Sequence, residues 1–120
     1  MSITEIIAFL KSLGITPVYP LAFPASSPDR AYMLEVGQGF SSRGSLADVV
    51  LTITVKAEHP SEAERMSIEL KEKLDKMTDV VIGDNQVVLI KAQQLLPNYL
   101  GMSADGFHFY MNNFRVLVND

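Results

Sequence analysis

The sequence contains few side chains of the types that catalyse reactions or hold metal ions. Its two histidines are His59, which precedes a proline, and His108, which lies near the end of the chain, and it has no cysteine. The lack of cysteine excludes thiolate nucleophiles and cysteine-based zinc sites. Neither histidine is accompanied by further ligands of suitable type and spacing, so the sequence predicts no metal site.

Other patterns that could suggest chemistry fit a structural role better. Asp79, Asp84 and Asp105 lie at predicted turns, where aspartate is favoured because its side chain bonds to the nearby backbone. The run Gly37-Gln38-Gly39 is not followed by Gly-Lys-Ser/Thr and leads into a strand, so it is no phosphate-binding loop. Neither G-x-S-x-G nor H-E-x-x-H occurs. The sequence therefore predicts no catalytic residue and no cofactor.

Length and composition predict a single globular domain spanning residues 1–120, with 48% apolar and 20% charged residues. The formal charge of -4 argues against a general nucleic-acid-binding protein, because such proteins are normally basic. No apolar run approaches the roughly 18 residues that a membrane-spanning helix needs. Glu5 and the lack of basic residues before it are not typical of a signal peptide, so we expect the first residues to belong to the fold.

The clearest structural signal is a strand followed by a helix between Asp48 and Met77. Residues Asp48–Ala57 alternate between two faces over ten positions, which predicts a half-buried strand. Ser61 and Glu64 have the spacing of a capping box and predict the start of a helix over Glu62–Met77. The apolar stripe of this helix comprises Ala63, Met66, Leu70, Leu74 and Met77.

A second capped helix is predicted at the start of the chain. Ser2 and Glu5 form another capping box, and an apolar stripe continues over Thr4–Leu13. Gly14 is the expected end of this helix, because glycine adopts the left-handed conformation at low cost.

The remaining segments predict short strands joined by turns. Prolines 17, 20 and 24 limit the next segment to an edge strand that pairs only around Val18–Leu21. Further strands are predicted over Arg30–Val36, Val80–Ile82, Gln86–Ala92 and Phe107–Val118, with a connection over Leu95–Gly106. The apolar face of the last strand changes near Asn112-Asn113, which indicates either a bulge or a strand buried on both faces.

These elements predict an α+β fold in which two helices pack on one face of a mainly antiparallel, four- to five-stranded sheet. The expected core comprises Leu10, Leu51, Ile53, Val55, Leu70 and Leu74. The Gly/Ser-rich stretch Gly37–Ala47 is longer than a usual hairpin loop, and we expect it to be mobile in the isolated subunit and to order on assembly. Phe40 is its candidate anchor, either on a partner or on the core of its own subunit.

The order of these elements resembles a known family. The chain is similar to minor capsid proteins of tailed phages and prophages that resemble phage tail terminators. The resemblance lies in the order of a capped helix, a proline-rich edge, a Gly/Ser loop, the alternating strand and a second helix. It also lies in the closing run over 107–118, Phe-His-Phe-Tyr-Met-Asn-Asn-Phe-Arg-Val-Leu-Val. The resemblance covers essentially the whole chain. It implies a virion structural protein, assembled in the host cytoplasm, that forms a hexameric ring on the tail tube and meets the tail tube protein and the head connector. DNA would pass through the ring without being specifically bound, and no cofactor or membrane is implied.

A surface for self-association is also predicted. Ile68 lies far around the second helix from the core stripe, beside Glu64 and Asp75. A closed ring needs two different patches per subunit, so we add the edge residues Tyr19 and Phe23. Phe40 and Arg43 complete the candidate set, with Arg43 the only charged residue within its loop.

Two alternatives of different classes remain open. One is a small-molecule-binding or regulatory α+β domain with a pocket between the sheet and the helices. The other is a small enzyme that uses His108 with Tyr110. Ile68 can also be explained without a function, as a single exposed apolar residue of the kind that most protein surfaces carry.

Overall fold

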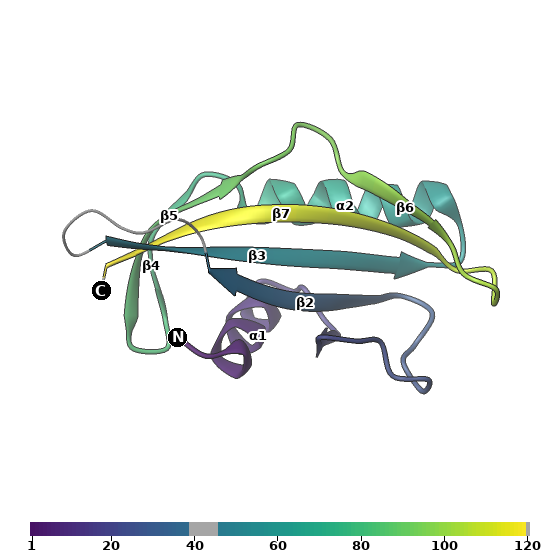
Figure 1. Cartoon of the computed structure of the whole chain (residues 1–120), viewed down its shortest axis with the longest axis horizontal. Coiled ribbons are helices and arrows are strands. Elements are labelled where there is room, and N and C mark those ends of the chain that lie inside the picture. The colour runs from purple at the N-terminus through teal and green to yellow at the C-terminus, as the bar shows by residue number, and fades with distance from the viewer. Residues whose placement is uncertain (39–45, 120) are drawn as a thin grey trace.

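The computed structural model describes residues 1–38 and 46–119, which form one curved sheet with two helices (Figure 1). Helix α1 spans Ile3–Ser12 and helix α2 spans Pro60–Leu74. The strands are β1 (Val18–Pro20), β2 (Ala31–Gln38), β3 (Leu46–Ala57), β4 (Met77–Ile82), β5 (Asn85–Ala92), β6 (Asn98–Met102) and β7 (His108–Asn119).

The sheet has seven strands, so the prediction of four to five was wrong. Their order is β1-β2-β3-β7-β5-β4, with β6 also paired to β7. Strand β6 lies inside the segment predicted as a connection, because it is short, contains Gly101 and shows no period-2 alternation. The sheet is mixed, since β1 pairs with β2 in parallel while every other recorded pair is antiparallel.

Helix α1 confirms its predicted caps, with bounds one residue earlier than expected. The Ser2 hydroxyl accepts a hydrogen bond from the Glu5 amide at 3.2 Å, and the Ser2 amide donates to Glu5 Oε1 at 2.9 Å. Gly14 follows the helix with φ of 83°, the left-handed conformation expected of a glycine that ends a helix.

Helix α2 begins and ends earlier than predicted. Its N-cap is His59, which makes no side-chain capping hydrogen bond, so the predicted capping box of Ser61 and Glu64 was wrong. Pro60 supplies the start instead, because proline fits the first helical position, where an amide has no partner in the helix. The helix stops at Leu74, and after Lys76 turns with φ of 66° the chain enters β4 at Met77.

The predicted core is confirmed. Leu10, Leu51, Ile53, Val55, Leu70 and Leu74 are each at most 1% exposed. Both helices contribute to a single buried cluster together with one face of β3 and β7. The space between the helices and the sheet is therefore filled by apolar side chains, and their burial provides the main stabilisation of the fold.

The opposite face of the sheet is covered at one end. Lys56 is only 7% exposed, and its ammonium lies 4.6 Å from the centre of the Phe107 ring and 5.4 Å from that of Phe23. It also donates a hydrogen bond to Ser27 Oγ at 2.6 Å. Phe23 packs in turn on Phe109, with ring centres 5.7 Å apart. These contacts fold the segment after β1 back over the sheet.

This covering explains the change of pattern along β7. The register between β3 and β7 is continuous from Leu46 to Ala57, so no bulge interrupts that pairing at Asn112-Asn113. Asn112 and the even-numbered residues after it face the helices, whereas Phe109 faces the covered side. The predicted bulge at Asn112-Asn113 is therefore wrong. Burial on both faces holds only in part, because the odd-numbered face of β7 is half-buried at Phe109 and exposed at Arg115.

Part of the predicted loop Gly37–Ala47 is strand. Gly37 and Gln38 belong to β2, while Leu46 and Ala47 belong to β3. Phe40, Arg43 and the expected mobility of this loop lie outside the described residues.

We predict that Leu70→Ala lowers the free energy of unfolding by about 2–5 kcal/mol, because it removes fully buried methyl groups and leaves a cavity. Leu96→Ala is the matched control, since Leu96 is 70% exposed and its replacement should change stability by no more than about 0.5 kcal/mol. Chemical denaturation measures both. Equal losses in the two variants would show that the assigned core is wrong.

Candidate assembly surface

Residues 93–97 form an arch that leaves the sheet between two strands. Strand β5 pairs with β7 as far as Ala92 opposite Phe114, and β6 joins the same edge of β7 at Asn98 opposite Met111. In Figure 1 the arch is the raised segment between the labels β5 and β6. It is anchored where the two strands separate, because the Gln93 amide donates to the Asn113 carbonyl at 2.9 Å.

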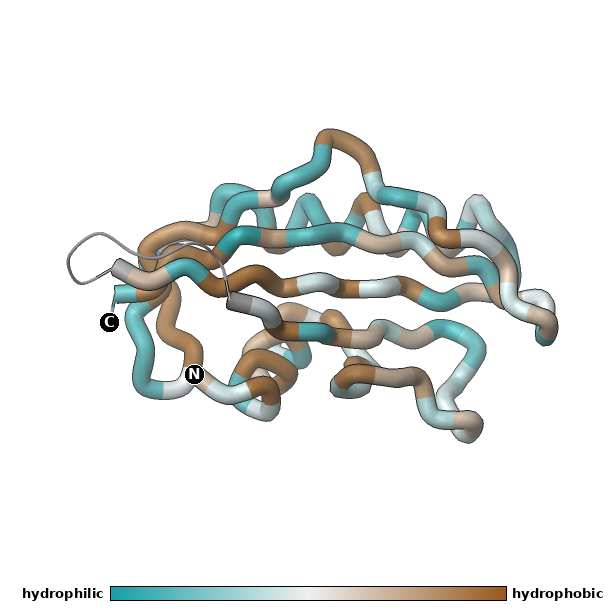
Figure 2. Tube along the Cα trace, viewed as in Figure 1, coloured by the Kyte–Doolittle hydropathy of each residue, from teal (hydrophilic) through white to brown (hydrophobic). Residues whose placement is uncertain are grey.

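The crest of the arch is apolar and exposed. Leu95 is 84% exposed and Leu96 is 70% exposed. Figure 2 shows this crest in the hydrophobic colour, projecting from the rest of the chain. Because these two adjacent leucines are held away from the core, they contribute no buried surface to the isolated subunit. Only contact with another molecule would bury them.

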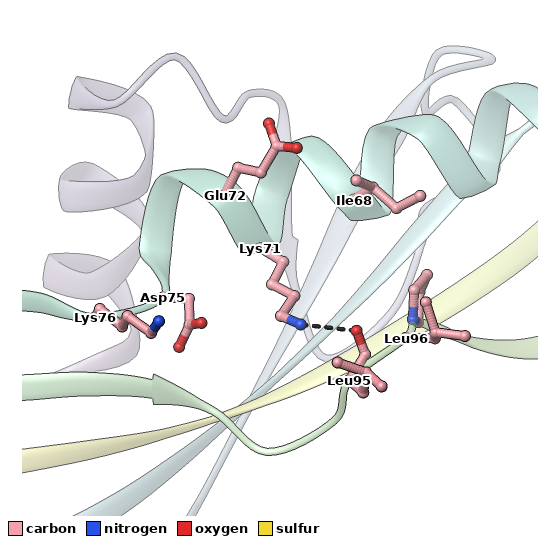
Figure 3. Close-up of a pocket in the computed structure, with 8 residues that line it drawn as sticks. Ile68, Lys71, Glu72, Asp75, Lys76, Leu95 and Leu96 are labelled. Atoms are coloured by element: carbon pink, nitrogen blue, oxygen red, sulfur yellow. Dashed lines mark hydrogen bonds between the residues drawn. The ribbon is translucent and has the colours of Figure 1, made fainter.

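A groove of about 360 Å³ separates the arch from α2 (Figure 3). One wall consists of Ile68, Lys71 and Glu72 of α2 with Asp75 and Lys76 just after it, and the other consists of Leu95, Leu96 and Pro97 of the arch. The groove is open to solvent, and Ile68 and Leu96 make one of its ends apolar. Such a shape suits an apolar side chain from a partner better than a small molecule that must be enclosed.

One hydrogen bond ties the arch to α2, and a second ties the end of β5, just before the arch, to the C-cap of the helix. Lys71 Nζ donates to the Leu95 carbonyl at 2.7 Å, the contact drawn in Figure 3. Asp75 Oδ1 accepts a hydrogen bond from the Ala92 amide at 2.8 Å. The charged groups beside the groove therefore satisfy backbone groups of the arch and of the adjacent end of β5, and they hold the arch at a fixed distance from α2.

The apolar surface continues from the arch along β6. Tyr99 is 47% exposed, Leu100 51% and Met102 63%. Leu100 is the extra residue of a bulge, because Tyr99 pairs with Tyr110 while Gly101 pairs with Phe109. Strand β6, the arch and Ile68 thus carry most of the large apolar side chains that are exposed in the described part of the chain.

The predicted interface residues fall in different places. Ile68 is 37% exposed and lines the groove, and Asp75 lines it too. Glu64 is exposed near Tyr110, one turn towards the start of α2. Tyr19 is half-buried in β1, and Phe23 turns inward onto Phe109.

Sequence reasoning missed the residues that are most exposed. The sequence predicts a connection over Leu95–Gly106 because of its turn residues, and this segment contains Leu95, Leu96, Leu100 and Met102. The signal that could have found them is the run Leu95-Leu96-Pro97, since adjacent leucines before a proline follow neither strand nor helix periodicity. Leu21, 68% exposed between the two predicted edge residues, was also missed.

The histidines do not form a catalytic arrangement. His108 Nδ1 lies 2.9 Å from the Tyr99 hydroxyl, and the Tyr99 ring stacks on His108 and packs at a tilt against Tyr110. Burial is the main cause that raises the pKa of Tyr110, and the nearby charge of Glu64 is the second. The raised pKa disfavours the phenolate, which is the nucleophilic form of this side chain. His59 is exposed at the start of α2 and does not belong to this aromatic cluster.

No group of three or more histidine, aspartate or glutamate side chains suited to a metal ion occurs among residues 1–38 and 46–119. Within those same ranges, neither helix is long and apolar enough to cross a bilayer.

We predict that the double variant His59→Asn, His108→Asn leaves the biological function of the protein intact, because neither ring lies in an arrangement suited to catalysis. Loss of the contact with Tyr99 should cost about 0.5–1.5 kcal/mol of stability. The number of finished particles per infected cell measures the first effect and thermal unfolding the second. A stable double variant that yields no particles would refute the assignment.

Comparisons with known proteins identify the family and support the fold. A family model described as bacteriophage tail terminator protein matches residues 9–120. A solved chain from the virion of a native gene transfer agent particle superposes with a TM-score of 0.69 and 18% identity, covering 94% of this chain and 86% of that chain. No curated protein matches the sequence. The chain belongs to the bacteriophage tail terminator protein family and is a structural component of the virion with a tail-terminating role.

Proposed function

We propose that this protein forms a ring on the end of the tail tube, where it stops tube growth and joins the tail to the head. The observation that carries the proposal is the exposed apolar surface of the arch, β6 and Ile68 in a member of the tail terminator family. A protein of this family is expected to cover such a surface by assembly, because contiguous apolar surface is costly in water.

Six copies are expected in the ring, with the tail tube protein on one side and the head connector on the other. The subunits assemble in the host cytoplasm. DNA passes through the channel without specific binding, which agrees with a formal charge of -4 per chain. Phe40 and Arg43 stay in the candidate interface with the tube, as residues of the Gly/Ser-rich loop.

The two alternatives receive less support from the described residues. A binding domain would place its pocket between the sheet and the helices, but Leu10, Ile53 and Leu70 fill that space. An enzyme would need a base, a nucleophile and an enclosed site. His108 and Tyr110 instead lie at a partly exposed aromatic cluster.

The proposed function predicts a defect in tail length when the gene is deleted. Particles made without the protein should have abnormally long tails or tails that lack heads, because nothing caps the growing tube. Negative-stain electron microscopy of the lysate, with and without the wild-type gene supplied in trans, measures the distribution of tail lengths. Head-bearing tails of normal length in the deletion strain would contradict the proposal.

A charge at the groove should abolish assembly without unfolding the subunit. We predict that Ile68→Asp fails to restore finished particles, because the aspartate would lose water on burial in an apolar contact. Stability should change little, since Ile68 is 37% exposed. Val81→Asp is the matched control on β4, where the side chain is 59% exposed, and it should restore particles. Full rescue by Ile68→Asp would remove α2 from the interface.

A further inference from the structure

We propose that Leu21 of one subunit inserts into the groove between α2 and the arch of the next subunit. This inference rests on the proposed ring and names the two surfaces that build it. The occupant of the groove is a second copy of this chain, which makes the contact head to tail rather than symmetric.

Leu21 is displayed outward by an unusual backbone conformation. Its φ is 68°, a left-handed value that bulky residues rarely adopt, and its side chain is 68% exposed. The backbone around it is fixed, since the Leu21 amide donates to the Leu34 carbonyl at 3.0 Å and the Ala22 amide to the Pro20 carbonyl at 2.8 Å. A strained, firmly held and exposed leucine is a feature that contact with a partner would explain.

Leu21 and the groove lie at opposite edges of the sheet and at the same height along the strands. Pro20 pairs with Leu34, which pairs with Ile53, which pairs with Asn112. The arch leaves β7 beside Asn112, because β6 begins one residue further along, opposite Met111. In Figure 1 the short β1 and the arch accordingly lie on the two sides of the long strands.

This placement suits a closed ring. Two patches at equal height on opposite edges let each subunit meet the next by rotation about an axis, with little shift along that axis. A difference in height would instead favour an open spiral.

The charge pattern of the sequence supports the same pairing. The two longest stretches without any lysine, arginine, aspartate or glutamate are Ser12–Pro28 and Ala92–Ala104. The first contains Leu21, and the second contains the arch and β6. The centres of protein interfaces are depleted in charged residues, because unpaired charges lose hydration there. Each uncharged stretch contains one short edge strand, β1 in the first and β6 in the second, so a head-to-tail contact would bury both together. The facing wall of the groove carries Lys71, Glu72, Asp75 and Lys76, whose charged ends would remain at the solvated rim of the contact.

Disulfide crosslinking tests the contact directly, because the chain contains no cysteine of its own. The variant Leu21→Cys, Leu96→Cys is supplied to a deletion strain, and purified particles are treated with a mild oxidant. Non-reducing gels should show a ladder at multiples of the 13.3 kDa chain that ends at the size of the closed ring. Each single-cysteine variant should remain a monomer on the same gel, and reduction should collapse the ladder.

Val81→Cys, Leu96→Cys is the matched control, because Val81 is exposed but lies on the β4 edge. A ladder from Leu21 with Leu96, and none from this control, supports the contact. Finished particles that contain the Leu21→Cys, Leu96→Cys variant but give no ladder would overturn it while leaving the proposed function intact. Particles that finish normally without the protein would contradict the function itself.

Leu21→Gly provides a second test that cannot fail through misfolding of the turn. Glycine adopts φ of 68° readily, so thermal stability should be unchanged or raised. We predict at least a tenfold loss of finished particles, because the inserted side chain is gone. A stable Leu21→Gly protein that rescues particle formation fully would overturn the inference.

Discussion

One edge of strand β7 is shared by two neighbours, and this determines where the protein exposes its apolar surface. Backbone groups of β7 must be satisfied along that whole edge, including the point where β5 ends and β6 has not begun. Gln94 meets this need, since its side-chain oxygen accepts a hydrogen bond from the Asn113 amide at 2.9 Å. On the face of β7 that packs against the helices, the buried Asn112 side chain donates to the Ser67 carbonyl at 2.9 Å. This bond fixes α2 against the point where β5 ends and β6 has not begun. The arch must therefore project beside α2, carrying Leu95 and Leu96 out of the sheet.

An exposed surface of this kind has a cost that assembly would offset. Burial of one leucine side chain contributes about 1.5–3 kcal/mol, so a ring that covers several gains substantial stability at each contact. Until then the surface favours aggregation, and the chain limits that risk in two ways. Strand β6 is short and bulged at Leu100, which makes it a poor template for further strands. The net negative charge keeps free subunits apart in solution.

The sequence predicts the elements with strong periodicity and misses those defined by tertiary contacts. Alternation over Asp48–Ala57 identifies β3, and the stripes of both helices identify the core, because burial on one face imposes a fixed period. Strand β6 has no such period, since it is a short edge strand interrupted by the bulge at Leu100. Ile68 was found because its position departs from a helical stripe. Leu21, by contrast, becomes notable only through its backbone conformation and its place opposite the arch, neither of which is encoded by a local pattern.

Electron cryomicroscopy of the head–tail junction tests the central claim most directly, namely that this chain forms the ring ending the tail and uses the arch edge of its sheet for assembly. The account predicts a ring of this fold at the top of the tail tube, with residues 93–97 of each subunit against the β1 edge of its neighbour. A ring in which the arches point outward into solvent, with Leu95 and Leu96 uncovered, would contradict it.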